Sequence, residues 1–472
     1  MKRIELIILL VFSNIFAFYN QDSRMIALSG AYTTIASGYK CVGVNPANLV
    51  DSDNVSINLL NIISNMLNNF FTLTRYNQIN GADLENENAP KYFAKDKILD
   101  YLNCDNIEFN AIGSFPIPMI NISSNNMSFN SGVTMYSDYE ISPDLIDILL
   151  NGNELNRYYD LSMFQDTFII WETSFSKAYE LSPISVGFSI KYLHGLGNYR
   201  LEPIQDTTYF LTDMIDVSAK AEYLLKQNMK GNGFSFDFGF ITNEFNGWKF
   251  GASIINIGGK IKWNKDMFVD QYLEDVYKSY PFRQNEHHHI SLSIADLNLS
   301  SLNDPNITTD SLFQVISQNV VESDTIISGF DYIESSENDF YYIPSDSLPD
   351  NYFNSSNAKI VNTDYPTKLN IGFSKKIDLQ KLVVCDISVG FDNSFMNKQK
   401  WRFALGYEFG SQKFPLRCGF SYGGYDGKSI GVGFGYNFGG YSMDFGLNYK
   451  GSYSYGSSTG YDIGLDFYWM KI

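Results

Sequence analysis

Histidine and cysteine, the side chains most often used for metal binding and nucleophilic chemistry, are scarce in this 472-residue chain. The four histidines are His194 and the run His287, His288 and His289. Adjacent side chains on a strand point to opposite faces, so only His287 and His289 share a side on which a metal ion could bind. A polar strand start explains the run more simply, and we predict no metal site.

Other groups with a known chemistry are equally sparse. The four cysteines, Cys41, Cys104, Cys385 and Cys418, show no zinc-ligand spacing, and no phosphate-binding loop occurs. The acidic stretch 301–366 lacks the regularly spaced Asp/Asn-Gly pattern of a calcium loop. We therefore predict no cofactor and no enzymatic activity.

Composition excludes further classes of protein. The chain has 34 Lys and Arg against 52 Asp and Glu, a net charge of −18, so we predict no nucleic-acid partner. Only 18% of residues are charged, below the roughly 25% of soluble domains, while 16% are aromatic. At 44% apolar the chain is too hydrophobic to be disordered. A chain poor in charge and rich in aromatics suits a bilayer with aromatic belts.

The first residues are typical of a secretory signal peptide. Lys2 and Arg3 precede an apolar run over residues 6–12, and Ala17 is a candidate cleavage-site residue. The run is shorter than the roughly 20 residues of a spanning helix, which disfavours the alternative of a retained anchor. We predict that residues 1–17 are removed on export. No comparable apolar run follows, so a membrane-embedded body must be a β-barrel.

The second half of the chain alternates apolar and polar residues with a period of two. The pattern runs through seven segments: 369–373, 383–391, 401–409, 416–422, 430–438, 441–449 and 461–469. One face is apolar throughout, and on the other face only Val384, Ala404 and Tyr468 are apolar. Because side chains alternate along a strand, these segments are predicted to be two-faced β-strands.

The composition of the two faces decides between a soluble β-sandwich and a membrane barrel. The polar face consists mainly of Gly, Ser, Asn and Asp, which suits a crowded, wet lumen. The apolar face has aromatic ends, such as Trp401 and Phe409, around an aliphatic middle such as Leu405. Two aromatic girdles around an apolar band require this arrangement. We therefore predict an all-β fold, a transmembrane antiparallel β-barrel in the cell outer membrane.

Less regular candidates complete the barrel, which we place at residues 53–472. They lie near 55–61, 106–117, 127–135, 167–177, 186–192, 234–240 and 248–254, which makes about 14 strands, with 12–16 tolerable. Short helices are expected at 90–102 and 141–150, in loops. Gly439-Gly440 is a two-residue hairpin signal and is placed in the periplasm. Residues 450–460 and the acidic connection 298–366 then lie outside the cell.

Residues 23–50 carry a motif that follows the signal peptide. Its core is Ala27-Leu28-Ser29-Gly30-Ala31, followed by Asn45-Pro46-Ala47-Asn48-Leu49. The motif resembles the opening of outer-membrane barrels similar to the long-chain fatty-acid channel (FadL) and of the PorV-type barrels of the type IX secretion system. The resemblance implies that residues 18–52 form a small plug inside or beneath the barrel, with Gly30, Ala31, Asn45, Pro46 and Ala47 as its motif.

The motif also has a physical account of its own. Pro46 fixes its own φ and pushes Asn45 out of the helical region, and Asn45 can then bond its own backbone and hold a turn. Ala27, Gly30 and Ala31 permit a close backbone approach in a crowded lumen. A plain helix-to-strand connection without a gating role stays open as an alternative.

Two further features receive a predicted role. Asp462, Gly464, Phe467 and Trp469 resemble a C-terminal barrel-assembly signal, so we expect the barrel-assembly machinery as a partner. Pro116 and Pro118 interrupt a strand candidate, because proline removes a ladder donor. By analogy with the fatty-acid channels, these prolines open a lateral gap to the bilayer; a strand that simply ends in a turn is the alternative.

Three functions remain open. The first is a plugged channel for hydrophobic small molecules, in contact with outer-membrane lipid. The second is a PorV-like scaffold that anchors or shuttles secreted proteins through its outer loops. The third and weakest is an outer-membrane esterase, for which His194 is the only histidine near a strand with serine close by.

Overall fold

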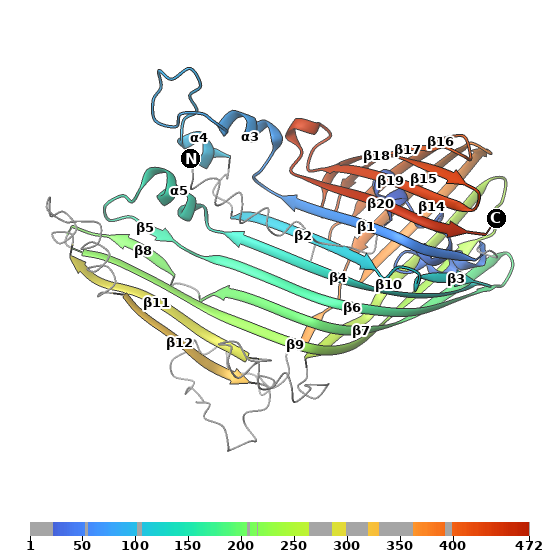
Figure 1. The fold of residues 1–472 in the computed structure, drawn as a ribbon, viewed down its shortest axis with the longest axis horizontal. Coiled ribbons are helices and arrows are strands. Elements are labelled where there is room, and N and C mark those ends of the chain that lie inside the picture. The colour runs from blue at the N-terminus through green and yellow to red at the C-terminus, as the bar shows by residue number, and fades with distance from the viewer. Residues whose placement is uncertain are drawn as a thin grey trace, which may run out of the picture.

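A closed antiparallel barrel forms the body of the computed structural model (Figure 1). The structure describes residues 22–51, 55–101, 106–204, 208–214, 216–263, 286–298, 320–329, 362–391 and 399–471. Fourteen of the described strands make the ring: β1 (Ser56–Asn68), β2 (Ile107–Pro116), β4 (Met127–Ile141), β6 (Met163–Glu180), β7 (Ile184–Pro203), β9 (Asp216–Thr242), β10 (Trp248–Trp263), β14 (Lys368–Asp378), β15 (Lys381–Gly390), β16 (Arg402–Gly410), β17 (Pro415–Gly423), β18 (Gly427–Phe438), β19 (Tyr441–Lys450) and β20 (Gly460–Met470). Pairing of β1 with β20, from Ser56↔Met470 to Leu67↔Gly460, closes it.

The strand prediction is confirmed, because each of the fourteen predicted segments falls on one of these strands. The predicted faces are also confirmed. On β9, Phe234 and Phe236 are about half exposed on the outside, whereas the intervening Ser235 is fully buried. Val384 and Ala404, apolar exceptions on the polar face, are buried inside the barrel. The outward face is therefore a continuous apolar band.

Several strands are much longer than the nine to eleven residues expected for a membrane crossing. Strand β9 has 27 residues. Its first part pairs with β11 (Glu286–Asn298), whereas its last part pairs with β10. A 27-residue strand spans roughly 90 Å, far more than the hydrocarbon core, so part of β9 projects beyond the membrane. The predicted segment 234–240 covers only part of β9, because alternation marks a strand but not how far it extends past the lipid.

The predicted loop 298–366 also contains strands. Within it, β12 (Val320–Gly329) pairs with β11, and β13 (Asn362–Asp364) pairs with β10; most of the connection lies outside the described residues. Short strands β5 (Tyr158–Asp160) and β8 (Tyr209–Thr212) pair at the same end of the barrel. The His287–His289 run lies on β11, consistent with a strand start.

The two ends of the barrel differ. At one end, short turns join the strands, at residues 125–126, 181–183, 243–247, 379–380, 411–414 and 439–440. The opposite end carries the helices α3 (Leu73–Ile79), α4 (Asp96–Asp100) and α5 (Pro143–Asn151) (Figure 1). Helices were predicted at 90–102 and 141–150, whereas α3 was not foreseen. Within the described part of the chain, no helix has the length and apolarity of a membrane span.

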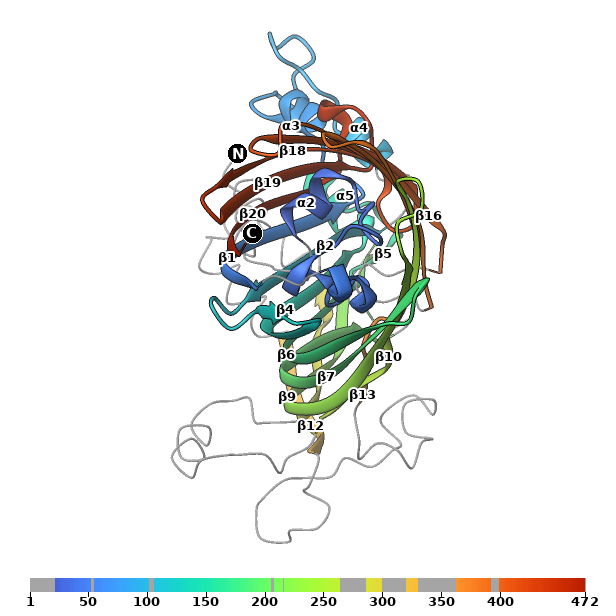
Figure 2. The same ribbon diagram turned by 90° about the vertical axis from the view of Figure 1, so that its right-hand side faces the viewer.

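The N-terminal segment, residues 22–51, lies inside the ring of strands (Figure 2). It consists of helix α2 (Ser23–Ala27) and the 3₁₀ turns η1 (Gly38–Cys41) and η2 (Pro46–Asp51). Asp22 caps α2 by accepting the backbone N–H of Met25 at 3.0 Å. Helix α2 contacts β17 to β20, and η2 contacts β6, β7 and β9 on the opposite wall. The proposed signal peptide, residues 1–17, lies outside the described residues.

If the outward apolar band faces lipid, the loss of unfolding free energy caused by a charged residue on it depends on the depth of that residue in the membrane. Ile371 and Ile377 are both exposed on the outward face of β14, in mid-strand and beside a short turn respectively. We expect Ile371→Arg to lower the unfolding free energy by about 2–4 kcal/mol and Ile377→Arg by about 0–1 kcal/mol. Urea unfolding in lipid vesicles measures both. Equal costs for the two variants would contradict a bilayer around this face.

Candidate functional site

Glycines on the lumen face make room for the N-terminal segment. A Cβ atom built on any of several wall glycines would lie less than 3.0 Å from an atom of the segment; they are Gly187, Gly239, Gly372, Gly406, Gly419, Gly431, Gly433, Gly446 and Gly464. At Gly419 the obstruction is the backbone of Leu28, and at Gly446 it is the backbone of Ser23. Backbone cannot rotate away as a side chain can. The alternating glycines of the sequence therefore mark where the segment packs.

A continuous chain of ion pairs fastens the segment to the wall. Arg24 of α2 pairs with Glu408 at 2.9 Å, and Glu408 pairs with Arg417 at 2.6 Å. Arg417 continues to Asp444 at 2.6 Å, and Asp444 lies 3.6 Å from the Lys40 Nζ. Alternating charges in a buried chain satisfy one another, which a single buried charge could not achieve.

Lys40 ends this chain on the N-terminal segment. Its Nζ lies 3.1 Å from Asp466 and 4.0 Å from the ring centre of Tyr468. Burial disfavours the charge of Lys40, but Asp466 and Asp22 outweigh burial and raise its pKa well above the ordinary value. Tyr468, the third apolar exception on the polar face, thus serves as a cation–π partner.

Asp386 anchors the middle of the segment. One carboxylate oxygen accepts three hydrogen bonds of 2.7 Å, from the backbone N–H groups of Tyr32 and Thr33 and from the Thr33 hydroxyl. On either side of this anchor, Val384 and Ala404 pack in an apolar cluster with the segment. These two wall residues interrupt the polar pattern because they face a packed segment and not water.

The predicted plug motif is structurally explained residue by residue. Gly30 has φ +81°, and a Cβ there would collide with the Arg402 guanidinium, which donates to the Ser29 carbonyl at 2.8 Å. Ala31 is completely buried. Glycine at position 30 therefore allows both the left-handed backbone conformation and the close approach of Arg402.

Asn45 holds the second half of the motif as foreseen. Its Oδ1 accepts the Ala47 N–H at 3.1 Å, the local turn bond expected from the sequence. Its Nδ2 donates to the carbonyl of Phe240 at 3.1 Å and to that of Thr33 at 3.3 Å. Pro46 opens η2, and Ala47 is fully buried. One side chain thus ties the turn, the segment and the wall together.

The wall is interrupted at the two prolines. Strand β2 ends at Pro116, and β3 (Ile122–Ser124) then takes its place between β1 and β4. Residues 117–121 leave the ladder between β2 and β3; they include Pro118, and Met119 at their centre is exposed by 73%. The predicted strand end is therefore present, at the predicted position.

Asn121 bridges this interruption. Its side-chain amide donates to the carbonyls of Ile117 (2.9 Å) and Ser131 (3.1 Å), and its Oδ1 accepts the Ser131 N–H at 2.7 Å. These bonds replace the ladder bonds that the prolines cannot make. Directly inside lies a cavity of about 40 Å³, whose lining includes Pro116, Asn121, Thr134 and Lys40.

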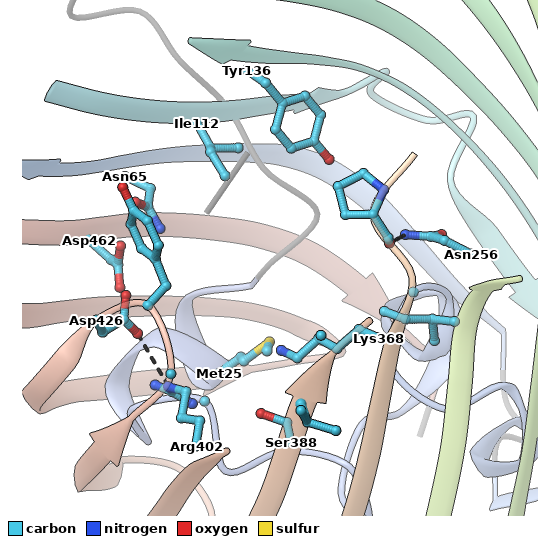
Figure 3. Close-up of a pocket in the computed structure, with 18 of the residues that line it drawn as sticks. Met25, Asn65, Ile112, Tyr136, Asn256, Lys368, Ser388, Arg402, Asp426 and Asp462 are labelled. Atoms are coloured by element: carbon cyan, nitrogen blue, oxygen red, sulfur yellow. Dashed lines mark hydrogen bonds and ion pairs between the residues drawn. The ribbon is translucent and has the colours of Figure 1, made fainter. Parts of the chain in front are cut away.

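A second and larger cavity, of about 110 Å³, adjoins the other side of the N-terminal segment; we refer to it as the chamber (Figure 3). Its floor includes Met25, Ile26 and Gly30 of the segment. Five basic residues line it, Lys191, Lys368, Lys400, Arg402 and Lys450, against two acidic ones, Asp426 and Asp462. Its apolar wall is formed by Ile112, Tyr136, Ile255 and Tyr365. The chamber therefore combines positive charge with aromatic surface.

The predicted assembly-signal residues lie on β20 and divide between its faces. Asp462 faces the lumen and pairs with Lys450 at 2.7 Å, and Gly464 approaches Ser23 of the segment. Phe467 stacks on Tyr441 with ring centres 5.9 Å apart on the outside, the face that Trp469 shares. Two of the four residues thus have lumen contacts, and recognition by the assembly machinery stays a prediction.

The arrangement of His194 and the candidate serines does not support the esterase hypothesis. His194 lies beside Trp171 on the outward face, with ring centres 6.3 Å apart. The Gly-x-Ser-x-Gly pattern, which marks nucleophile elbows on strand-to-helix turns, occurs around Ser421, Ser429 and Ser458. Ser421 and Ser429 lie on paired strands and bond each other at 2.6 Å, and Ser458 donates to a backbone carbonyl. The described residues contain no cluster of His, Cys, Asp or Glu suited to a metal ion.

Sequence reasoning missed the charges that fasten the segment. A usable signal existed, because pairing the equal segments 441–449 and 461–469 in full register places Asp444 opposite Asp466, as the structure has it. Two carboxylates facing each other across strands call for a cation between them. No pattern pointed to Lys40 as that cation, since it lies more than 400 residues away.

Fold and site define a membrane β-barrel whose lumen holds its own N-terminal segment. No protein-family model and no curated protein matches the sequence. Among solved structures it is similar to the toluene transporter TodX of Pseudomonas putida (10% identity, 97% of this chain and 99% of that chain covered, TM-score 0.47) and to a FadL homologue of Pseudomonas aeruginosa (10%, 96% and 99%, 0.48). Likeness at this level carries no argument about what this chain transports, so its function rests on its own residues.

Removing the charge of Lys40 tests whether the chain of ion pairs holds the N-terminal segment in the lumen. Lys40→Met leaves Asp444 and Asp466 facing each other in a buried site, and we expect a loss of about 3–5 kcal/mol of unfolding free energy. Lys249→Met is the matched control, because it breaks an exposed pair with Asp51 of the same segment and should cost about 0–1 kcal/mol. Denaturant unfolding in detergent micelles measures both variants. Similar costs would show that the chain of charges does not hold the segment.

Proposed function

We propose that this protein is an outer-membrane channel that admits hydrophobic small molecules and releases them sideways through its wall. The observation that supports it best is the interruption of the wall at residues 117–121 with a cavity directly behind it. A barrel in lipid normally satisfies every backbone group along a continuous ladder. An interruption at membrane depth is therefore a weak point that needs a reason.

The fastened N-terminal segment argues against a straight path through the lumen. A solute moving along the axis would have to break the ion chain from Arg24 to Lys40 and the three bonds to Asp386. Leaving those charges buried and unpaired costs several kcal/mol. We therefore assign the segment, within residues 18–52, the role of a plug that blocks the axis and directs a solute to the side.

The interruption offers a route that costs far less. A few backbone bonds, such as that from the Met119 N–H to the Asn58 carbonyl, and the side-chain amide of Asn121 are what bridges it. Pro116 and Pro118 bring no donors of their own. Met119 and Ile120 are exposed beside it, 73% and 41%, and supply an apolar lip. A hydrophobic solute gains by leaving water for the bilayer there, at about 25 cal/mol per Å² of apolar surface.

The remaining partners follow from the same proposal. Outer-membrane lipid contacts the outward aromatic band, and export depends on the proposed signal peptide. The assembly machinery would read Asp462, Gly464, Phe467 and Trp469. The PorV-like scaffold relied on the connection 298–366, and no feature of its described part favours binding of secreted proteins.

Filling the inner side of the interruption tests the route. Thr134 lines the small cavity, whereas the next residue, Met135, points to the opposite, outward face. In cells with a lipopolysaccharide-bearing outer membrane, we expect Thr134→Phe to slow uptake of a neutral hydrophobic dye to the rate of cells without the protein. Met135→Phe, with the same added ring on the lipid side, should leave uptake unchanged.

The result separates the proposed route from other possibilities. Uptake that is unaffected by Thr134→Phe, with a normal amount of folded barrel in the membrane, would overturn sideways release at residues 117–121. Equal loss in both variants would show that the ring perturbs β4 and not the route.

A further inference from the structure

We propose that the chamber binds a small organic anion whose apolar part is no larger than a single ring, and that Lys368 is the charge that recognises it. The inference rests on the proposed function and names the class of solute that the chamber would select, whereas the neutral dye of the uptake test probes only the sideways route at residues 117–121. It is carried by three observations of the chamber: its unbalanced charge, its aromatic wall and its size.

Most charges of the chamber are already balanced. Lys450 lies between Asp462 (2.7 Å) and Asp426 (3.0 Å), and Asp426 also pairs with Arg402 at 3.2 Å (Figure 3). A third cation, Lys191, has carboxylates of its own outside the chamber lining, Asp237 at 3.0 Å and Glu172 at 3.7 Å. The two acidic residues of the chamber are thus used by two of its cations.

Lys368 is left over. Within the part of the chain that the structure describes, no carboxylate lies within 4.0 Å of its ammonium group and no hydrogen bond engages it. It is the first residue of β14, partly buried, and it extends into the chamber (Figure 3). On the neighbouring strand, one oxygen of the Asp386 carboxylate accepts bonds from Tyr32 and Thr33, and this carboxylate attracts Lys368 only from beyond ion-pair distance. Lys400 has no ion-pair partner among the described residues either, but it is exposed to solvent.

An unbalanced cation in a lumen contrasts with the rest of this acidic chain, whose net charge is −18. Low-dielectric walls focus the field of Lys368 into the chamber and raise the local concentration of anions. A neutral solute would leave the ammonium group without a partner, so the site discriminates by charge. Discrimination of this kind is stronger than that of an apolar pocket, because mispaired buried polar groups are costly.

The opposite wall recognises the remainder of the ligand. The Tyr136 ring stacks on Phe168 with centres 4.7 Å apart and an angle of 6°, and Tyr365 packs edge-on against Tyr136 at 6.3 Å. This cluster is buried and anchored by the Tyr365 hydroxyl, which donates to Glu172 at 2.8 Å. A rigid aromatic surface facing a cation favours a flat apolar group attached to an anionic one.

The volume sets the upper limit of the ligand. The chamber measures about 110 Å³, and an engineered protein cavity of roughly 150 Å³ holds one benzene molecule. Because the chamber is smaller still, a single ring is the upper limit for the apolar part of a ligand. An extended long acyl chain does not fit.

Benzoate is the probe that combines ring and charge. Calorimetry on the purified full-length protein in non-ionic detergent compares benzoate with benzyl alcohol (ring without charge), acetate (charge without ring) and decanoate (a long chain). We expect benzoate to bind at least roughly tenfold more tightly than each of the others, because it alone meets both walls and the size limit.

Variants assign the effect to Lys368. Lys368→Met should weaken benzoate binding by roughly tenfold or more, and Lys368→Arg, which keeps the charge, should retain most of it. Lys376→Met is the matched control, because Lys376 is exposed at the far end of the same strand. Heat-modifiable electrophoretic mobility verifies that each variant is a folded barrel.

Each outcome decides the proposal. Benzyl alcohol or decanoate binding as tightly as benzoate overturns it, as does an equal loss in Lys368→Met and Lys376→Met. If Lys368→Met does not fold, loss of charge selectivity cannot be read from it, and failure of Lys368→Arg to bind benzoate then overturns the proposal. Binding that depends on Lys368, together with dye uptake indifferent to Thr134→Phe, supports the anion site and overturns the proposed function alone.

Discussion

The structure depends on one close approach, that of the N-terminal backbone to wall positions that carry no side chain. Where Leu28 and Ser23 pass Gly419 and Gly446, a single added methyl group would overlap backbone atoms. All other lumen contacts follow from this proximity. Arg24 reaches Glu408 only because α2 lies against the wall, and the floor of the chamber is the same helix. Glycine at these wall positions is thus a requirement of the packed segment and not of the strand.

The charges of the N-terminal segment and of the barrel wall neutralise each other. Asp444 and Asp466 face each other across paired strands, an arrangement that destabilises a sheet unless a cation lies between them. Lys40 is that cation, and it belongs to the segment. An empty barrel would carry unpaired carboxylates, and a free segment would carry unpaired cations. Neither part is electrostatically complete alone, so displacing the segment would leave buried charges unpaired on both sides.

The sequence predicts this fold well because alternation reports locally which side of a strand faces lipid. The three apolar exceptions on the polar face, Val384, Ala404 and Tyr468, contact the segment, so even departures from the pattern carried information. What the sequence could not reveal is long-range register. The partner of Lys40, the bridging amide of Asn121 and the unbalanced charge of Lys368 all arise from contacts between distant strands, which no local period encodes.

The same wall carries the ion pairs that fasten the segment and, between β2 and β3, an interruption of its ladder. Along most of β1, the ladder to its neighbours is continuous, but opposite residues 117–121 it is reduced to the backbone bonds of Asn58. On the other side of the interruption, the side chain of Asn121 bonds Ser131 of β4. In lipid, unpaired backbone groups are expensive, so the amide of Asn121 is needed to keep such a break closed. A side chain can rotate away without unfolding a strand, whereas a ladder bond cannot. The interruption is therefore the part of the wall where a side chain replaces ladder bonds, while the ion chain holds the lumen segment in place.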